Sequence, residues 1–262
     1  MSGLPVFAYD TGPESDLPPL LLIHGLLSSR EHWLPNRALS KVFRIIRVDL
    51  PAHGASPTLE EPEAARPEAM VRALDILRCS LGIPRWHICG QSFGAGLSLR
   101  YALDYPDRCI AQIFTNANAA LRRHWPPDAQ AAHRDLVAAL WSGGPTAIRR
   151  IPYHPVHARR FSPEIRKILS IEADKVDPGG YALLQQEAIP RLFVCDRLGE
   201  LRVPTLLVNG LKERRFQPTR DWLAATHPEI SITDLDGGHS INIENPAEFN
   251  QAVSSFLQDH GP

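Results

Sequence analysis

Short apolar runs of strand length alternate with helix-like segments along the first half of the chain. The strand-like runs and the helical patterns between them cover residues 20–23, 31–41, 43–48, 67–81, 86–89, 92–105 and 109–115. This order is typical of a mainly parallel sheet with helices on both faces. It resumes later, with strand-like runs at 205–209 and 230–235 and helical patterns at 219–226 and 246–258. The chain is therefore expected to fold as an α/β protein around one sheet.

The alternation of strands and helices is interrupted between residues 120 and 192. Helix-like pieces in this stretch are separated by Pro-rich or Gly-rich breakers at 125–127, 142–145 and 177–180. This pattern predicts a helical cap inserted into the core. The resulting division assigns residues 1–119 and 193–262 to the α/β core and residues 120–192 to the cap.

Charge and apolar patterning favour a small-molecule substrate. The 262 residues carry 28 Lys and Arg against 29 Asp and Glu, a formal net charge of −1. This balance gives no overall field that favours nucleic acid or an anionic membrane. The apolar runs are far shorter than the ~20 residues that cross a bilayer, and the N-terminus lacks the basic and apolar regions of a signal peptide. We therefore expect no nucleic-acid partner, no membrane span and a cytoplasmic location.

A serine flanked by glycines stands at one of the strand-to-helix junctions. Residues 90–94 read Gly-Gln-Ser-Phe-Gly, between a strand-like run and a helix-like one. A serine on such a sharp turn projects its hydroxyl away from the backbone, and Gly90 and Gly94 allow the tight turn. This setting is that of a nucleophile elbow, which makes Ser92 the candidate nucleophile. The alternative is a serine in an ordinary tight turn.

A serine hydroxyl is a weak nucleophile near neutral pH and needs a base within hydrogen-bond reach. Among the 11 histidines, His239 stands out because it lies in a Gly-rich loop, residues 236–240, directly after the last strand-like run. Open α/β sheets place their sites at this end of the strands. His239 is therefore the candidate base, and the alternative is a loop histidine that bonds only locally.

A carboxylate is needed to orient the base. Glu213 is the first carboxylate after the strand-like run at 205–209, which gives the chain order serine, acid, histidine. Asp221 is the alternative acid, since a glutamate beside Arg214 and Arg215 equally suits a solvated ion pair.

Acyl transfer also requires N–H donors aimed at the developing oxyanion. Residues 24–27 read His-Gly-Leu-Leu and follow the first strand-like run. The expected donors are the backbone N–H groups of Leu26 and of Phe93, the residue after the candidate nucleophile. His24 and His53, each in a turn after a strand-like run, are expected to brace their loops.

Together these segments resemble the α/β-hydrolase superfamily across nearly the whole chain. The set comprises residues 24–25, 49–56, 90–94, 203–210 and 237–239. The chain length, the oxyanion turn and the single helical cap are similar to the branch of capped esterases, lactonases and carbon–carbon hydrolases. The resemblance implies eight mostly parallel strands, with Ser92 as nucleophile and His239 as base. This branch commonly has Asp at the position of Glu213, so the chain departs from the pattern there.

The cap is expected to roof the substrate pocket. Its aromatic residues Trp125, Trp141 and Tyr153 are candidates for lining an apolar acyl or ring site, although packing within the cap explains them equally well. Arginine pairs at 122–123, 149–150, 159–160 and 214–215 suit either a substrate anion or solvated helix faces. The cap histidines lack metal-ligand spacing and serine chemistry needs no metal, so neither a metal nor a cofactor is expected.

These features predict a serine hydrolase that cleaves a small carboxylic ester or lactone through a Ser-His-Glu triad and an acyl-enzyme. The same triad acting on a carbon–carbon bond or a thioester is the near alternative, because the cap pocket decides the substrate. A ligand-binding or receptor module with low turnover is the alternative from another functional class.

Overall fold

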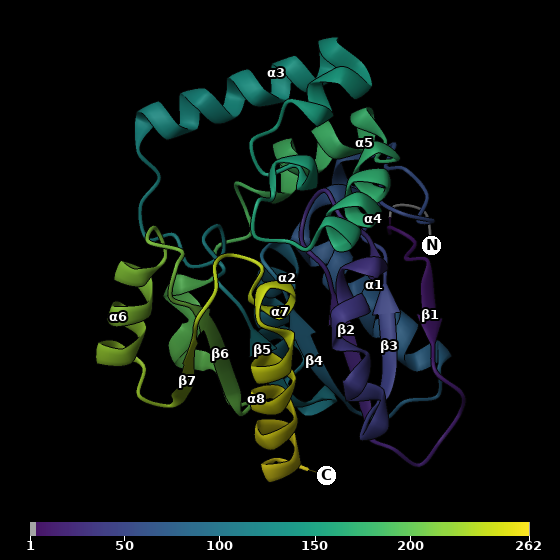
Figure 1. The fold of residues 1–262 in the computed structure, drawn as a ribbon, viewed down its shortest axis with the longest axis vertical. Coiled ribbons are helices and arrows are strands. Elements are labelled where there is room, and N and C mark those ends of the chain that lie inside the picture. The colour runs from purple at the N-terminus through teal and green to yellow at the C-terminus, as the bar shows by residue number, and fades with distance from the viewer. Residues whose placement is uncertain (1–3, 262) are drawn as a thin grey trace.

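A computed structural model of the chain describes residues 4–261 and contains a seven-stranded sheet (Figure 1). The strands follow the order β1-β3-β2-β4-β5-β6-β7, and every neighbouring pair is parallel except β1 with β3. Their bounds are β1 (Tyr9–Thr11), β2 (Pro19–Ile23), β3 (Arg44–Val48), β4 (Trp86–Gly90), β5 (Cys109–Phe114), β6 (Thr205–Gly210) and β7 (Ile230–Leu235). The mainly parallel sheet predicted from the alternation is confirmed.

The sheet has one strand fewer than the eight that the resemblance implied. Residues 4–8, which precede β1, form no strand. Pro5 has no N–H to give to a strand ladder. The N–H of Ala8 donates to Ser56 Oγ (2.8 Å), and the Ala8 carbonyl accepts from the N–H of Asp49 (2.8 Å). This stretch is therefore bonded to the end of β3 and the loop beyond it, and β1 forms the edge of the described sheet.

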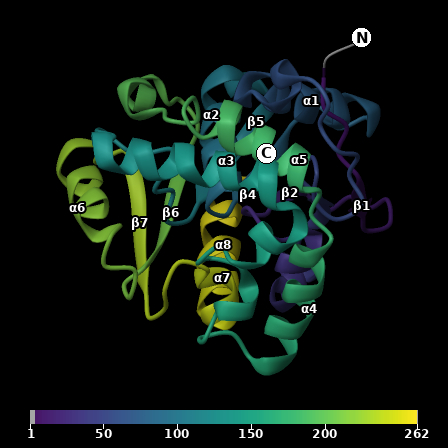
Figure 2. The same cartoon turned by 90° about the horizontal axis from the view of Figure 1, so that it is seen from above.

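Side chains along the strands point alternately into two hydrophobic cores, one on each face of the sheet. In β2, Leu21 belongs to the core that includes α1 (Pro67–Ser80) and α2 (Phe93–Asp104), whereas Leu22 belongs to the core that includes α8 (Pro246–Asp259). The alternation follows from the two-residue period of a strand. Figure 2 shows α1 and α2 on one side of the sheet and α8 on the other. The prediction of helices on both faces is thus confirmed.

Several shorter helical segments connect these elements. They are η1 (Arg30–Lys41), η2 (Pro62–Ala65), η3 (Pro106–Arg108), η6 (Cys195–Glu200), α6 (Gln217–Thr226) and α7 (Ile241–Glu244). The helical pattern expected at residues 31–41 forms 3₁₀ turns rather than an α-helix. Pro35 lies inside this segment, and Asn36 has non-helical angles of φ −100° and ψ 18°. Because proline lacks an N–H, a regular α-helix cannot continue through it.

Residues 120–192 form a group of helices beyond one end of the strands (Figure 1, teal to green). They are α3 (Pro127–Arg149), η4 (Pro155–His157), α4 (Pro163–Asp174), α5 (Pro178–Leu183) and the π-helical η5 (Leu184–Ala188). Leu140, Ala173 and Tyr181 from three of these helices share a small core with Leu27, which lies in the loop after β2. The helices therefore pack over the loops at the carboxyl ends of the strands.

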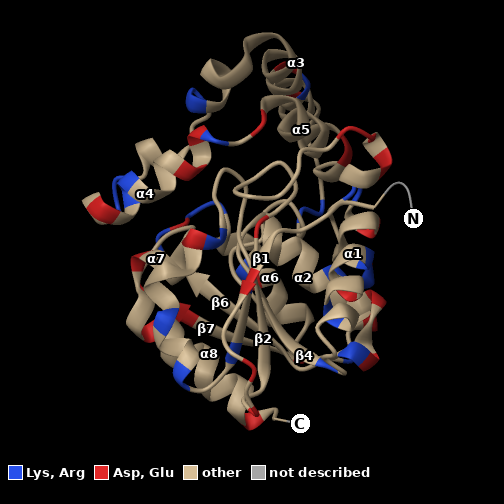
Figure 3. Ribbon diagram, turned by 90° about the vertical axis from the view of Figure 1, so that its right-hand side faces the viewer, with Lys and Arg blue, Asp and Glu red and all other residues tan. Residues whose placement is uncertain are grey.

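Charged residues lie mainly on the outer helices and loops, and the strands are mostly uncharged (Figure 3). All residues of β4, β5 and β6 are buried, as expected for strands covered on both faces. Within residues 4–261, no helix combines the length and the apolar character needed to cross a bilayer.

Candidate active site

Ser92 lies on the sharp turn between β4 and α2. Its backbone has φ 55° and ψ −109°, and a positive φ of this kind costs a non-glycine residue about 1–3 kcal/mol. A Cβ atom on Gly90 would collide with the carbonyl of Gly94, and one on Gly94 would collide with the carbonyl of Ile23. Close backbone approach therefore requires both glycines. The turn presents Ser92 to a cavity of about 790 Å³.

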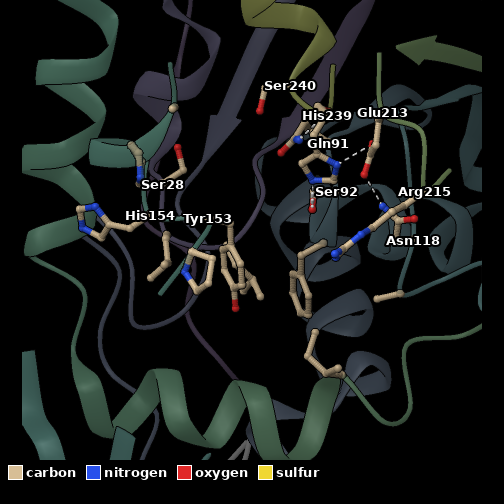
Figure 4. Close-up of a pocket in the computed structure, with 18 of the residues that line it drawn as sticks. Ser28, Gln91, Ser92, Asn118, Tyr153, His154, Glu213, Arg215, His239 and Ser240 are labelled. Atoms are coloured by element: carbon tan, nitrogen blue, oxygen red, sulfur yellow. Dashed lines mark hydrogen bonds and ion pairs between the residues drawn. The ribbon is translucent and has the colours of Figure 1, made fainter. Parts of the chain in front are cut away.

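Ser92, His239 and Glu213 are joined by hydrogen bonds (Figure 4). Ser92 Oγ lies 2.8 Å from His239 Nε2, and His239 Nδ1 lies 2.9 Å from Glu213 Oε2. A carboxylate can only accept, so the imidazole hydrogen lies on Nδ1 and leaves Nε2 free to accept from the hydroxyl. The structure thus brings together the three residues that the sequence selected for serine chemistry.

Glu213 is supported by two asparagines that follow β5. The side chain of Asn118 donates to Glu213 Oε1, and Asn116 bonds both the N–H and the carbonyl of Gly210, at the start of the Glu213 turn. Burial acts to raise the pKa of Glu213. The hydrogen bond and charge of His239, with bonds from the two asparagines, outweigh burial and lower that pKa below its usual value. Glu213 is therefore ionised at neutral pH.

Asp221, the alternative acid, lies away from this hydrogen-bonded chain. It belongs to α6, its side chain is 74% exposed, and it pairs with Arg220 at 3.4 Å. Solvent weakens an exposed ion pair of this kind. The geometry therefore favours Glu213 over Asp221 as the partner of His239.

Two residues that the sequence analysis did not identify hold the loop that carries His239. Gln91 Nε2 donates to the backbone carbonyl of His239 at 3.2 Å, and Glu244 Oε2 accepts the N–H of Gly238 at 2.8 Å. The position of Gln91 beside Ser92 was a usable signal for its role. No sequence signal marked Glu244, because its contact with Gly238 depends on how the loop folds back onto α7.

Two backbone N–H groups border the cavity beside Ser92. The N–H of Leu26 has no hydrogen-bond partner within residues 4–261. The N–H of Phe93 stands at the first residue of α2, where N–H groups find no partner inside the helix. Both residues line the cavity. They are the pair that the sequence analysis expected to stabilise an oxyanion.

Two buried histidines tie the turn after β2 to the turn after β3. His24 Nε2 accepts the N–H of Leu50 at 2.9 Å, and His53 Nε2 accepts the N–H of Leu27 at 3.1 Å. Each Nδ1 in turn faces a nearby backbone carbonyl, at 2.6 Å for His24 and 2.9 Å for His53. A nitrogen that accepts a hydrogen bond cannot carry a proton, so both rings are neutral. These contacts match the bracing role expected for both residues.

Burial disfavours the charged form of these and neighbouring histidines. It lowers the pKa of His24 well below 6.5, and it lowers the pKa of His53 and of His32 to about 4. His32 lies between Ser28 Oγ and Asn242 Oδ1, at 3.1 and 3.2 Å. The folded protein therefore holds several neutral imidazoles at pH values where an unfolded chain would protonate them.

We expect the free energy of unfolding to fall as the pH is lowered from 6.5 to about 4, the interval set by the pKa values of His32 and His53. In this interval the unfolded state binds protons that the folded state excludes, so acid favours unfolding. The stabilisation that these neutral histidines give is complete above 6.5, the pKa of a histidine in the unfolded chain. At about 1.4 kcal/mol per pKa unit, each of these two histidines accounts for about 3 kcal/mol.

Urea unfolding midpoints measured across this pH interval check the expectation. His53→Gln is the matched control, since its amide keeps an acceptor oxygen but takes up no proton. The variant should show a weaker dependence on pH than the unmodified chain. A midpoint that stayed constant across the interval would contradict the assignment of neutral buried histidines.

A cavity of about 790 Å³ opens at Ser92 and is lined by residues from the strand ends and from the helices of residues 120–192. Trp125 and Tyr153 line it, but Trp141 does not, so the prediction for Trp141 was wrong. Trp141 is 53% exposed, while its neighbour Leu140 is buried. Successive helical residues point about 100° apart, which turns Trp141 outward where Leu140 faces inward.

Two arginines of the predicted pairs, Arg122 and Arg215, also line the cavity. The guanidinium of Arg122 lies over the Trp125 ring, 3.7 Å from its centre, and burial lowers the pKa of Arg122. Figure 4 shows the side chain of Arg215 directed into the cavity near Ser92. Within residues 4–261, no three His, Cys, Asp or Glu side chains are grouped so that they could hold a metal ion.

The chain is similar to known enzymes along most of its length. It is 27% identical over 257 residues to an uncharacterised carboxylesterase, nap, of Bacillus subtilis, covering 94% of this chain and 81% of that protein. It is 25% identical over 248 residues to 2-succinyl-6-hydroxy-2,4-cyclohexadiene-1-carboxylate synthase of Pectobacterium atrosepticum, covering 92% of this chain and 94% of that protein.

The fold has close counterparts among solved structures. The crystal structure of the enol-lactonase from Burkholderia xenovorans superposes with a TM-score of 0.82 at 24% identity, covering 96% of both chains. A family model described as the alpha/beta hydrolase fold matches residues 18–246. These residues include the elbow, the candidate acid and the candidate base. The chain belongs to the α/β-hydrolase fold family.

Proposed function

We propose that this chain is a serine hydrolase that cleaves a small carboxylic ester or lactone, with Ser92 as nucleophile, His239 as base and Glu213 as the orienting acid. The observation that carries the proposal is the continuous hydrogen-bonded chain from Ser92 Oγ through His239 to Glu213, with distances of 2.8 and 2.9 Å. A base in contact with both a nucleophile and an orienting carboxylate is the signature of covalent acyl transfer.

In the proposed reaction Ser92 carries the acyl group and His239 moves the protons. His239 Nε2 removes the proton from Ser92 Oγ as the oxygen attacks the substrate carbonyl. The N–H groups of Leu26 and Phe93 stabilise the resulting oxyanion. When the intermediate collapses, His239 gives the proton to the departing alcohol oxygen, and an acyl-enzyme remains on Ser92. His239 then deprotonates a water molecule, which attacks the acyl-enzyme and releases the acid.

The cavity and the relatives support a small acyl substrate. A volume of about 790 Å³ is in the range of pockets that bind small molecules. The carboxylesterase relative favours ester cleavage. We further propose that residues 120–192 act as a cap over a core of residues 1–119 and 193–262, because side chains of this segment line the cavity opposite Ser92.

A carbon–carbon bond or a thioester is the alternative substrate for the same triad. The synthase relative is named for chemistry other than ester hydrolysis, so the ester assignment depends on the cavity rather than on the triad. A ligand-binding module with low turnover is the alternative from another class. The hydrogen-bonded chain argues against it, because binding alone does not require an activated serine.

A fluorophosphonate probe tests the proposal without knowledge of the substrate, because it reacts with activated serines. We expect one adduct per chain, located on Ser92 by peptide mass spectrometry and absent from Ser92→Ala. Ser240 lines the same cavity and is the matched control, since Ser240→Ala should be labelled like the unmodified chain. A folded protein that gave no adduct, or an adduct on Ser240, would refute the proposed nucleophile.

A further inference from the structure

A cluster of three polar side chains lies in the part of the cavity formed by residues 120–192. The hydroxyls of Tyr153 and Tyr181 are 2.9 Å apart, and Gln185 Nε2 donates to both, at 3.2 Å to Tyr153 and 2.8 Å to Tyr181. Tyr153 and Gln185 line the cavity. Tyr181 is fully buried behind them and packs edge-on against His53, with ring centres 5.7 Å apart. Figure 4 shows Tyr153 across the cavity from Ser92 and His239.

One hydroxyl hydrogen of this cluster has no acceptor among the three side chains. The two amide hydrogens of Gln185 go to the two phenol oxygens. The phenols contribute two hydrogens, and their mutual contact uses one of them. Within residues 4–261, no other hydrogen bond involves either hydroxyl. One phenol O–H must therefore find its acceptor outside the described protein.

Burial decides which of the two phenols has the unused hydrogen. A fully buried Tyr181 hydroxyl that donated to nothing would be costly, so Tyr181 donates to Tyr153. Tyr153 lines the cavity and is 50% exposed, whereas Tyr181 is fully buried. Burial also raises the pKa of Tyr153, and it raises the pKa of Tyr181 further. Both phenols therefore keep their hydrogens at neutral pH.

We propose that the Tyr153 hydroxyl donates a hydrogen bond to a second oxygen of the substrate, one that is remote from the carbonyl attacked by Ser92. The preferred substrate is then an ester or lactone that bears an additional oxygen acceptor, such as a second carbonyl. Tyr181 and Gln185 act as positioning residues for the Tyr153 hydroxyl. This inference rests on the proposed hydrolase function and names the substrate class of the same site.

The surroundings of the cluster make such a contact selective. Leu136, Pro152, Phe161 and Leu169 also line the cavity, and a hydrogen bond in apolar surroundings is stronger than one exposed to water. A substrate without the second oxygen would leave the Tyr153 hydrogen with no acceptor. We expect a preference of about ten-fold for the oxygen-bearing ester, the size of one typical hydrogen bond.

The test uses paired chromogenic esters that differ by one oxygen. p-Nitrophenyl levulinate is compared with the valerate, and longer oxoalkanoates are compared with alkanoates of equal length, since the reach from Ser92 to Tyr153 selects the chain length. We expect the unmodified protein to favour at least one oxo ester by about ten-fold in kcat/KM. Tyr153→Phe should abolish this preference by raising KM for the oxo ester more than for the plain ester.

Two further variants separate a specific contact from a structural effect. Tyr181→Phe leaves the Tyr153 hydroxyl in place but removes its partner, so the preference should shrink without disappearing. Tyr9→Phe removes a hydroxyl from an exposed side chain on β1 and should retain the full preference. Tyr9→Phe should also hydrolyse the plain alkanoates as fast as the unmodified protein does.

The outcomes distinguish this inference from the function on which it rests. If the unmodified protein hydrolyses alkanoates and oxo esters equally well at every chain length, the inference is wrong and the hydrolase stands. An unchanged preference in Tyr153→Phe also overturns it. If no ester is hydrolysed and the fluorophosphonate probe leaves Ser92 unmodified, both proposals fail together. A Tyr153→Phe variant that does not fold leaves the comparison in the unmodified protein decisive.

Discussion

Replacing Ser92 or His239 with alanine is expected to lower ester hydrolysis by about 10⁴-fold or more, and the double variant should lose no more than either single one. The reason is geometric. Ser92 Oγ and His239 Nε2 are 2.8 Å apart and act as one unit, so a serine without its base is as unreactive as a missing serine. Steady-state kcat for one small aryl ester, measured in all three variants, gives the comparison.

Ser142→Ala is the control for this comparison. Ser142 is exposed on α3, so its replacement should leave kcat unchanged. Independent losses that multiply in the double variant would show that Ser92 and His239 do not cooperate. Retention of full activity in His239→Ala would require another base, and the proposed triad would have to be abandoned.

Glu213→Gln is expected to lower kcat by about 10⁴-fold while KM changes little. The carboxylate accepts the hydrogen of His239 Nδ1 at 2.9 Å, which leaves Nε2 free to accept from Ser92. An amide nitrogen at the same place donates to Nδ1 and moves the imidazole hydrogen to Nε2, where it blocks deprotonation of the serine. The change keeps the size of the side chain, so the effect should come from the tautomer rather than from packing.

Asp221→Asn is the matched control for the acid, since it makes the same chemical change in the alternative carboxylate. Asp221 is 74% exposed and pairs with Arg220, so its loss should leave kcat unchanged. If Asp221→Asn lost activity and Glu213→Gln kept it, the assignment of the acid would be reversed. A modest loss in both variants would mean that neither carboxylate fixes the tautomer of His239.

The parts of the site that lie in one stretch of sequence were predictable. The turn at Ser92 depends on Gly90 and Gly94, whose roles are local and visible in the sequence, because a Cβ atom at either position would collide with nearby backbone. The loop of His239 likewise follows directly from the end of β7. Strand ends and glycine-rich turns are encoded over a few neighbouring residues.

The parts that depend on long-range contacts were not predictable. Asn118 reaches Glu213 across 95 positions of sequence, and no local pattern marks such a pair. Strand β1 is three residues long, too short to show a period of two. The error at Trp141 arose from the phase of α3, because its sequence does not reveal which side of the helix meets the cavity.

The cavity draws most of its lining from one continuous stretch, residues 120–192, whereas the hydrogen-bonded chain of Ser92, His239 and Glu213 comes entirely from outside it. Substitutions within this stretch can change what fits without moving the reacting atoms. Natural variants of this chain are therefore free to diversify in substrate along a single segment, and a laboratory library confined to it should yield new specificities at little risk to the chemistry.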